Sequence, residues 1–142
     1  MSRATCANCA GAASMIFDPG ILIWCFRGNR RALKMIGSEQ ARALSIVSFM
    51  ELVQGARSLV EVREIRRFLR DNAFRLLPLD EAMSLLAASL VETHALRSGL
   101  QVADALIAAT ARETGEILAT GNVRHFRPIA GLRLKPFRPK AA

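Results

Sequence analysis

Short apolar runs alternate with longer helical patterns along this chain, and the alternation limits the folds open to it. A strand pattern followed repeatedly by a helix pattern favours a parallel β-sheet with helices on its faces. The expected strands are residues 15–17, 43–47, 74–77, 117–120 and 132–134. The clearest expected helices are residues 21–27, 60–72, 81–96 and 102–114. We therefore expect a single α/β domain built on a parallel sheet.

Three acidic residues stand alone inside apolar runs. Asp18 lies within MIFDPGILIW, Glu51 within LSIVSFMELV and Asp104 within LQVADALIAATA. A buried carboxylate loses its hydration, so each should be paired, bound to a cation or open to a cleft. Asp18, Glu51 and Asn122 follow expected strands, and Asp104 begins a helix. Because sites in such folds form beyond the carboxyl ends of the strands, these four residues can meet at one edge.

Carboxylates gathered at one edge repel each other unless they are protonated or neutralised. A hard divalent cation such as Mg²⁺ or Mn²⁺ relieves the repulsion, because these ions prefer oxygen ligands. A metal ion held in this way can activate water and stabilise charge on a phosphate. The net charge of the chain is +8, which favours a polyanionic partner such as nucleic acid. These features together predict metal-dependent hydrolysis of a nucleic-acid backbone.

Five stretches, three of which carry these acids, occur along the chain in an order that matches a known family. They are Asp18 before ILIW, SFMELVQGAR around Glu51, RLLPLDEA, VADALIAATA around Asp104, and ILATGNVRHFRPIAGLRL. Residues 15–136 thereby resemble a PIN-domain ribonuclease, specifically a VapC-type toxin of a type II toxin–antitoxin system. The resemblance implies a five-stranded parallel sheet in an α/β/α sandwich. It also implies a Mg²⁺- or Mn²⁺-dependent endoribonuclease acting on structured RNA such as tRNA or rRNA, a VapB-like antitoxin partner and a homodimer.

The resemblance places the family's metal-binding acids at Asp18, Glu51 and Asp104, and its fourth catalytic position at Asn122. We assign Asp18 and Asp104 as the principal metal ligands. Glu51 is expected to bind the same metal or to orient the attacking water. Asn122 is expected to hydrogen-bond a metal-bound water or the phosphate. The family's chemistry implies cleavage that leaves a 5′-phosphate and a 3′-hydroxyl.

The chain departs from the family pattern at Pro19 and Gly20, where residues with polar side chains are usual, and at Gly121, where a basic residue is common. These departures leave open a catalytically weak PIN-like module that binds RNA or a protein. A phospho-receiver domain is a further alternative, and Thr120 fits it superficially. This chain lacks the acidic pair that a receiver carries after its first strand. An Asp-x-Asp phosphatase does not fit either, because residue 20 is Gly.

Other residues have plainer structural interpretations. Ser48 and Glu51 are spaced as a capping box at a helix start. His94 and His125 are expected to be structural, with a general-base role for His125 as the minor alternative. Asp80 is expected to cap the helix that follows it.

Two surfaces remain open to interpretation. The basic stripe of helix 60–72 is a solvated face or an RNA contact; it comprises Arg63, Arg66, Arg67 and Arg70. Trp24, Phe26 and Met35 are core residues or, where exposed, a groove for an antitoxin helix.

The two ends of the chain are expected to lie outside the domain. Residues 1–14 should be an extension, residues 15–136 the PIN domain and residues 137–142 a basic tail. Cys6 and Cys9 form a lone CxxC motif without the two further ligands that a zinc site needs. No run is apolar enough for a membrane span or a signal peptide, so we expect a cytoplasmic protein without a membrane partner.

Overall fold

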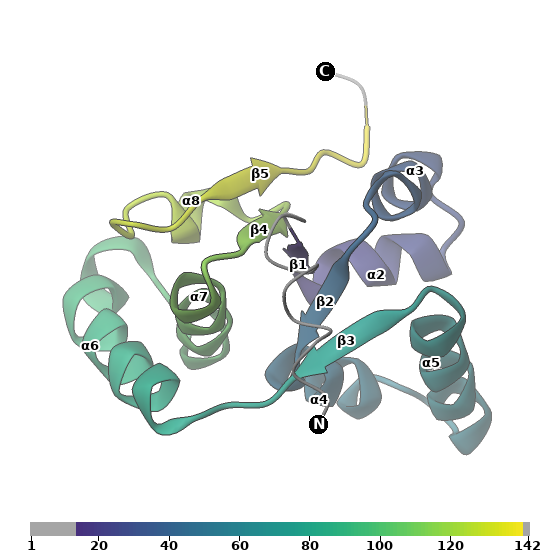
Figure 1. Cartoon of the computed structure of the whole chain (residues 1–142), viewed down its shortest axis with the longest axis horizontal. Coiled ribbons are helices and arrows are strands. Elements are labelled where there is room, and N and C mark those ends of the chain that lie inside the picture. The colour runs from purple at the N-terminus through teal and green to yellow at the C-terminus, as the bar shows by residue number, and fades with distance from the viewer. Residues whose placement is uncertain (1–13, 141–142) are drawn as a thin grey trace, which may run out of the picture.

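The computed structural model describes residues 14–140 and contains one five-stranded sheet with all strands parallel (Figure 1). The strands are β1 (Met15–Phe17), β2 (Arg42–Ser45), β3 (Phe74–Leu77), β4 (Ile117–Thr120) and β5 (Leu134–Pro136). Their spatial order is β3-β2-β1-β4-β5. The predicted α/β/α sandwich around a five-stranded parallel sheet is confirmed.

Seven described helices cover the two faces of this sheet. They are α2 (Pro19–Phe26), α3 (Arg30–Ser38), α4 (Ile46–Gln54), α5 (Leu59–Asp71), α6 (Glu81–Ser98), α7 (Val102–Thr114) and α8 (Val123–Phe126). Alternate residues of each strand face opposite sides, so Ile16 joins the core beneath α6, α7 and α8. Met15 and Phe17 join the core beneath α2, α3, α4 and α5. The central strand β1 therefore links both layers of the sandwich.

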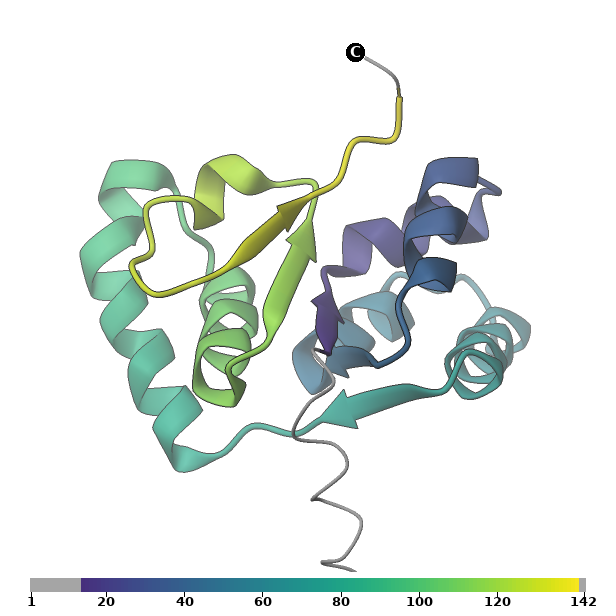
Figure 2. The same cartoon turned by 45° about the horizontal axis from the view of Figure 1, so that its top comes forward.

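The strand order reverses beside β1, and this reversal creates the site. After β1 the chain turns into α2, whereas after β4 it turns the opposite way into α8 (Figure 2). The two exits are held together, because the Asp18 amide donates to the Ala119 carbonyl at 2.9 Å. A crevice at such a reversal is the usual ligand position in parallel α/β sheets.

The start of α4 differs from the expected capping box. Strand β2 ends at Ser45, whose hydroxyl accepts a hydrogen bond from the Val47 amide at 3.2 Å and caps the helix. Ser48 lies inside the helix and is fully buried, so the prediction that it caps the helix is wrong. The sequence offered two serines three residues apart, and the earlier one ends the strand because its hydroxyl satisfies a backbone donor there.

The C-terminal segment also differs from expectation. Strand β5 begins two residues later than predicted, and its pairing with β4 continues through the Phe137 amide, which donates to the Thr120 carbonyl at 2.9 Å. Phe137 is buried, and the Pro139 carbonyl accepts from Asn29 Nδ2 at 3.1 Å. The chain is therefore fixed to the domain as far as Pro139.

Two further predictions concern the cap of α6 and the N-terminal extension. The Asp80 carboxylate accepts from the Met83 amide at 2.8 Å, which confirms Asp80 as the cap of α6. The predicted extension, residues 1–14, lies outside the described residues apart from Ser14. No helix in the described part of the chain is long and apolar enough to cross a membrane.

Candidate active site

Asp18 is the innermost acid of the site. It follows β1 directly as the cap of α2, and its side chain is only partly exposed. Thr120, the last residue of β4, donates its hydroxyl hydrogen to Asp18 Oδ2 at 2.5 Å. The same hydroxyl oxygen accepts from the Asn122 amide at 2.9 Å. Thr120 is fully buried, so this hydroxyl fixes the ends of two neighbouring strands to each other.

A second set of contacts connects Asn122 to Asp104. Asn122 Nδ2 lies 2.8 Å from His125 Nδ1, and that ring nitrogen lies 3.2 Å from Asp104 Oδ2. Asp104 sits in the first turn of α7 as predicted, and its carboxylate also accepts from the Gln101 amide at 3.4 Å. Polar contacts therefore extend from Asp18 to Asp104, and His125 Nδ1 can accept from Asn122 or donate to Asp104, according to its tautomer.

Glu51 approaches the same place from α4 but is not part of this chain. Its side chain is exposed, and it lies on the helix rather than at its first turn. The pKa of Glu51 is raised, first by partial loss of surrounding water and then by the negative charges of Asp18 and Asp104. Glu51 therefore lies within electrostatic range of both Asp18 and Asp104.

Asp18 has the least favourable environment for a charge. Burial raises its pKa above the ordinary value of 3.8, and the charge of Asp104 raises it further. The hydrogen bond from Thr120 acts in the opposite direction, because it stabilises the ionised form, but burial dominates. An ionised Asp18 at neutral pH is therefore a partly desolvated charge that a cation would stabilise.

The donor chemistry of the three acids fits a hard divalent cation. Within residues 14–140, the three salt bridges include no Lys or Arg on Asp18, Glu51 or Asp104. One of these three salt bridges involves an acid of the site, and it joins His125 to Asp104. In the same part of the chain, no three Asp, Glu, His or Cys side chains converge closely enough to hold an ion as they stand. The acids are therefore neighbours without a cationic partner, and binding an ion would require their side chains to close in.

Sequence reasoning missed two members of the site. Thr120 was considered only for a receiver domain, although its position at the end of β4, two residues before Asn122, pointed to the edge where the acids meet. For His125 the sequence favours a structural role, with a general base as the minor alternative; its Nδ1 lies within hydrogen-bond distance of both Asn122 Nδ2 and Asp104 Oδ2. Its spacing of three residues from Asn122 across one helical turn could have shown that both side chains share a face.

Replacing Thr120 by Val is expected to destabilise the protein by about 1–3 kcal/mol, because the Asn122 amide loses its acceptor and Asp18 loses its donor. Val has nearly the same shape, so the loss isolates the hydroxyl. Urea unfolding at neutral pH measures the change.

Thr120→Ser is the matched control, because it keeps the hydroxyl and removes only a methyl group. It should lose no more than about 1 kcal/mol. If Ser and Val destabilise the protein equally, the hydroxyl bridge does not support the site.

Comparisons with known proteins agree with this architecture. The PIN-domain family model matches residues 15–132. A toxin–antitoxin complex from Klebsiella pneumoniae contains a chain with 26% sequence identity and a TM-score of 0.73, covering 90% of this chain and 99% of that chain. No curated protein sequence matches the chain.

Two further solved structures share the fold at lower identity. VapBC2 from Rickettsia felis, bound to a promoter DNA fragment, contains a chain with 17% identity and a TM-score of 0.72, covering 88% of this chain and 99% of that one. VapBC-1 from nontypeable Haemophilus influenzae contains a chain with 17% identity and a TM-score of 0.71, covering 87% of this chain and 97% of that one. The chain therefore belongs to the PIN-domain family, whose members are generally nucleases, and it has the fold of VapC-type toxins.

Proposed function

We propose that this chain is a Mg²⁺- or Mn²⁺-dependent endoribonuclease toxin, neutralised by a VapB-like antitoxin. Its substrate would be structured RNA such as tRNA or rRNA. The observation that carries the proposal is the meeting of Asp18, Glu51 and Asp104 at the strand reversal without a Lys or Arg partner among the described residues. The Klebsiella relative, which belongs to a toxin–antitoxin complex, supports the biological role.

Each side chain would have a distinct task. Asp18 and Asp104 would hold the metal ion, which supplies an activated water and neutralises charge on the phosphate. Glu51 would hold the same ion or orient the attacking water. Asn122 would donate its amide to a phosphate oxygen or to a water. Thr120 would keep the Asp18 carboxylate in place, because its hydroxyl already contacts that group.

The departures at Pro19 and Gly20 leave the position of Asp18 intact. Pro19 is the first residue of α2, where a missing amide hydrogen costs nothing and the fixed φ suits a helix. Gly20 is exposed, and a Cβ built there has no atom within 4 Å. These features favour an active enzyme over a binding module, and they leave room for Gly20→Ser to restore the usual hydroxyl.

Cleavage of total cellular RNA by the purified, antitoxin-free protein tests the proposal. Discrete cuts with Mg²⁺ or Mn²⁺, lost with a chelator and in Asp104→Asn, are expected, with 5′-phosphate ends. A 2′,3′-cyclic phosphate would instead mean attack by the RNA's own 2′-hydroxyl. If neither wild type nor Gly20→Ser cuts RNA while both bind the metal, the binding module replaces the enzyme.

An apolar groove supports the proposed antitoxin partner. It has a volume of about 620 Å³ and lies among α2, α4 and α5. Its lining includes the exposed Phe26, the partly buried Phe68 and Glu51, one of the three acids. Trp24 and Met35, expected in such a groove, do not line it. An amphipathic antitoxin helix seated here would reach the catalytic acids.

We also propose the homodimer and the cytoplasmic location that the family resemblance implies. Large hydrophobic side chains are exposed on several elements and would suit contact with a second copy; among them are Met50, Leu76, Leu85 and Val102. Light scattering of the purified protein measures the oligomeric state directly.

A further inference from the structure

A second hollow, of about 610 Å³, includes Asn122 in its lining. We propose that this hollow binds a phosphate of single-stranded RNA next to the one that is cut, through Arg127 and Arg138 with Arg124 beside them. The proposal rests on the nuclease function above and adds a place where the substrate backbone is held. Three arginines and no Asp or Glu line the hollow among the described residues.

Arg124 and Arg127 lie on the turn after β4. Phe126 and Ile129 are buried and anchor this turn to the core. The Arg127 amide donates to the Val123 carbonyl at 2.8 Å, so the helical turn of α8 continues to Arg127. Arg124 and Arg127 are three residues apart and consequently share one face, on which both side chains are exposed.

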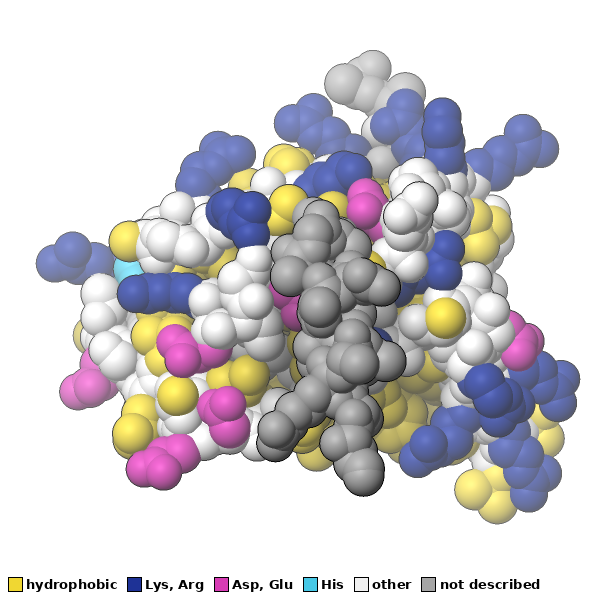
Figure 3. Space-filling view, viewed as in Figure 1, with side chains coloured by type: hydrophobic (Ala, Val, Ile, Leu, Met, Phe, Trp, Pro, Cys, Tyr) yellow, Lys and Arg dark blue, Asp and Glu magenta, His cyan; other side chains and the backbone are white. Residues whose placement is uncertain are grey.

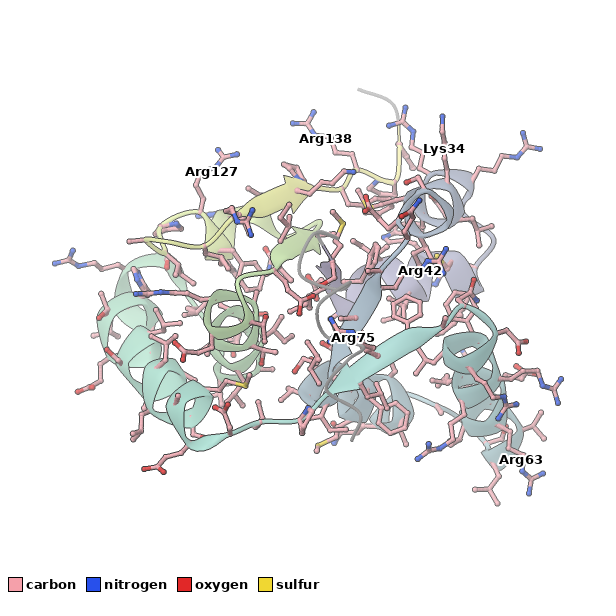
Figure 4. All side chains as sticks on the ribbon, in the orientation of Figure 1. Lys34, Arg42, Arg63, Arg75, Arg127 and Arg138 are labelled. Carbon is pink, nitrogen blue, oxygen red and sulfur yellow. The ribbon has the colours of Figure 1, made fainter. Side chains whose placement is uncertain are left out.

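Arg138 reaches the same hollow from the segment after β5. Its two neighbours are fixed, because the Phe137 amide donates to the Thr120 carbonyl and the Pro139 carbonyl accepts from Asn29. The backbone at Arg138 is therefore held before any ligand binds, which reduces the entropy lost on binding. Figure 4 shows Arg127 and Arg138 pointing outward along the same edge of the molecule.

None of these guanidinium groups takes part in the three salt bridges between described residues. Figure 3 shows Lys and Arg gathered along this edge, over α8, β5 and α3, whereas acidic side chains gather below, around α6. The apolar groove among α2, α4 and α5 differs, because its lining mixes both signs of charge: Glu51, Glu61 and Glu64 with Arg27 and Arg57. A polyanion would therefore be attracted more strongly to the arginine hollow, which has no carboxylate among its described lining residues.

Gly121 also lines the hollow, and a Cβ at this position would lie 3.4 Å from the Phe137 carbonyl oxygen. Arginine binds phosphate oxygens through two parallel hydrogen bonds, so Arg127 and Arg138 can each hold a phosphate that enters the hollow. Asn122 lines the hollow and also joins the acid network, which makes the two places continuous.

Binding of a short fluorescein-labelled single-stranded RNA, measured by anisotropy in chelator over a range of salt concentrations, tests the proposal without cleavage. The double variant Arg127→Gln/Arg138→Gln should bind about 10-fold more weakly at 0.15 M salt, and its slope of log K against log salt should be shallower by about 1.4, as expected for two lost single-strand phosphate contacts. In cleavage assays with metal, KM should rise while kcat stays unchanged.

Arg97→Gln/Arg112→Gln is the matched control, because it removes the same charge from exposed positions on α6 and α7. Arg127→Lys/Arg138→Lys should recover the salt slope, since it restores the charges. If the Arg127→Gln/Arg138→Gln variant binds RNA as this control does, RNA does not use this hollow and a protein partner becomes its candidate occupant. RNA binding that depends on both arginines without any cleavage would overturn the nuclease function and leave this site standing.

Discussion

Asp18→Asn is expected to abolish RNA cleavage and, at the same time, to make the metal-free protein more stable at neutral pH. Loss of the carboxylate removes a principal metal ligand, which should reduce the rate at least about 100-fold. Stability should rise by about 1 kcal/mol, because the substitution removes a desolvated charge that no Lys or Arg compensates among the described residues.

The direction follows from the raised pKa of Asp18. A carboxyl group whose pKa is higher in the folded than in the unfolded state binds more protons when folded. Folding stability therefore falls as pH rises from the ordinary value of 3.8 through the raised pKa. Above that window the ionised group destabilises the fold fully, and Asn removes this effect.

Thermal unfolding in chelator at two pH values measures the effect. The variant should melt several degrees higher than wild type at about pH 7, and the difference should vanish below about pH 3, where Asp18 is protonated in both the folded and the unfolded state. An equal gain at both pH values would show that the stabilisation does not come from the charge. Asp71→Asn, at the exposed end of α5, should keep full cleavage activity.

Mg²⁺ or Mn²⁺ is expected to stabilise wild type strongly, by about 2.7 kcal/mol when the ion is present at 100 times its dissociation constant. This corresponds to a rise in Tm of roughly 10 °C for a domain of this size. The gain should shrink as pH falls, because protons compete with the metal at Asp18 and Glu51, whose pKa values are raised.

Melting curves with and without the divalent ion, at matched ionic strength, measure this linkage directly. Asp104→Asn should lose the gain, and Asp71→Asn should retain it. An equal gain in wild type and Asp104→Asn would place the ion elsewhere on the protein. A gain that grows as pH falls would contradict binding to ionised carboxylates.

The fold was predictable because its pattern is local. Short strands alternate with helices along the chain, and several helices have a capping side chain next to them in sequence, as Asp80 does for α6. Element boundaries were less predictable where two residues compete for one task. Ser45 and Ser48 could each start α4, and the choice depends on where β2 leaves the sheet.

The site was predictable only in part. A lone acid in an apolar run is visible in a sequence, so Asp18, Glu51 and Asp104 could be named as neighbours from strand order alone. The role of Thr120 was hidden, because a buried threonine at a strand end is common and its bond to Asp18 joins residues 102 positions apart. The arginines that line the second hollow could not be grouped from the sequence for the same reason, since α8 and the segment after β5 meet only in three dimensions.

The pairing of β1 with β4 has a consequence for how the protein is made. A chain is synthesised from its N-terminus, and domains fold as their segments become available. Asp18 is among the first described residues, yet its hydroxyl partner and its backbone acceptor both belong to β4, about a hundred positions later. The catalytic edge therefore cannot assemble on a growing chain until most of it has left the ribosome, so the proposed nuclease stays inactive during most of its own synthesis.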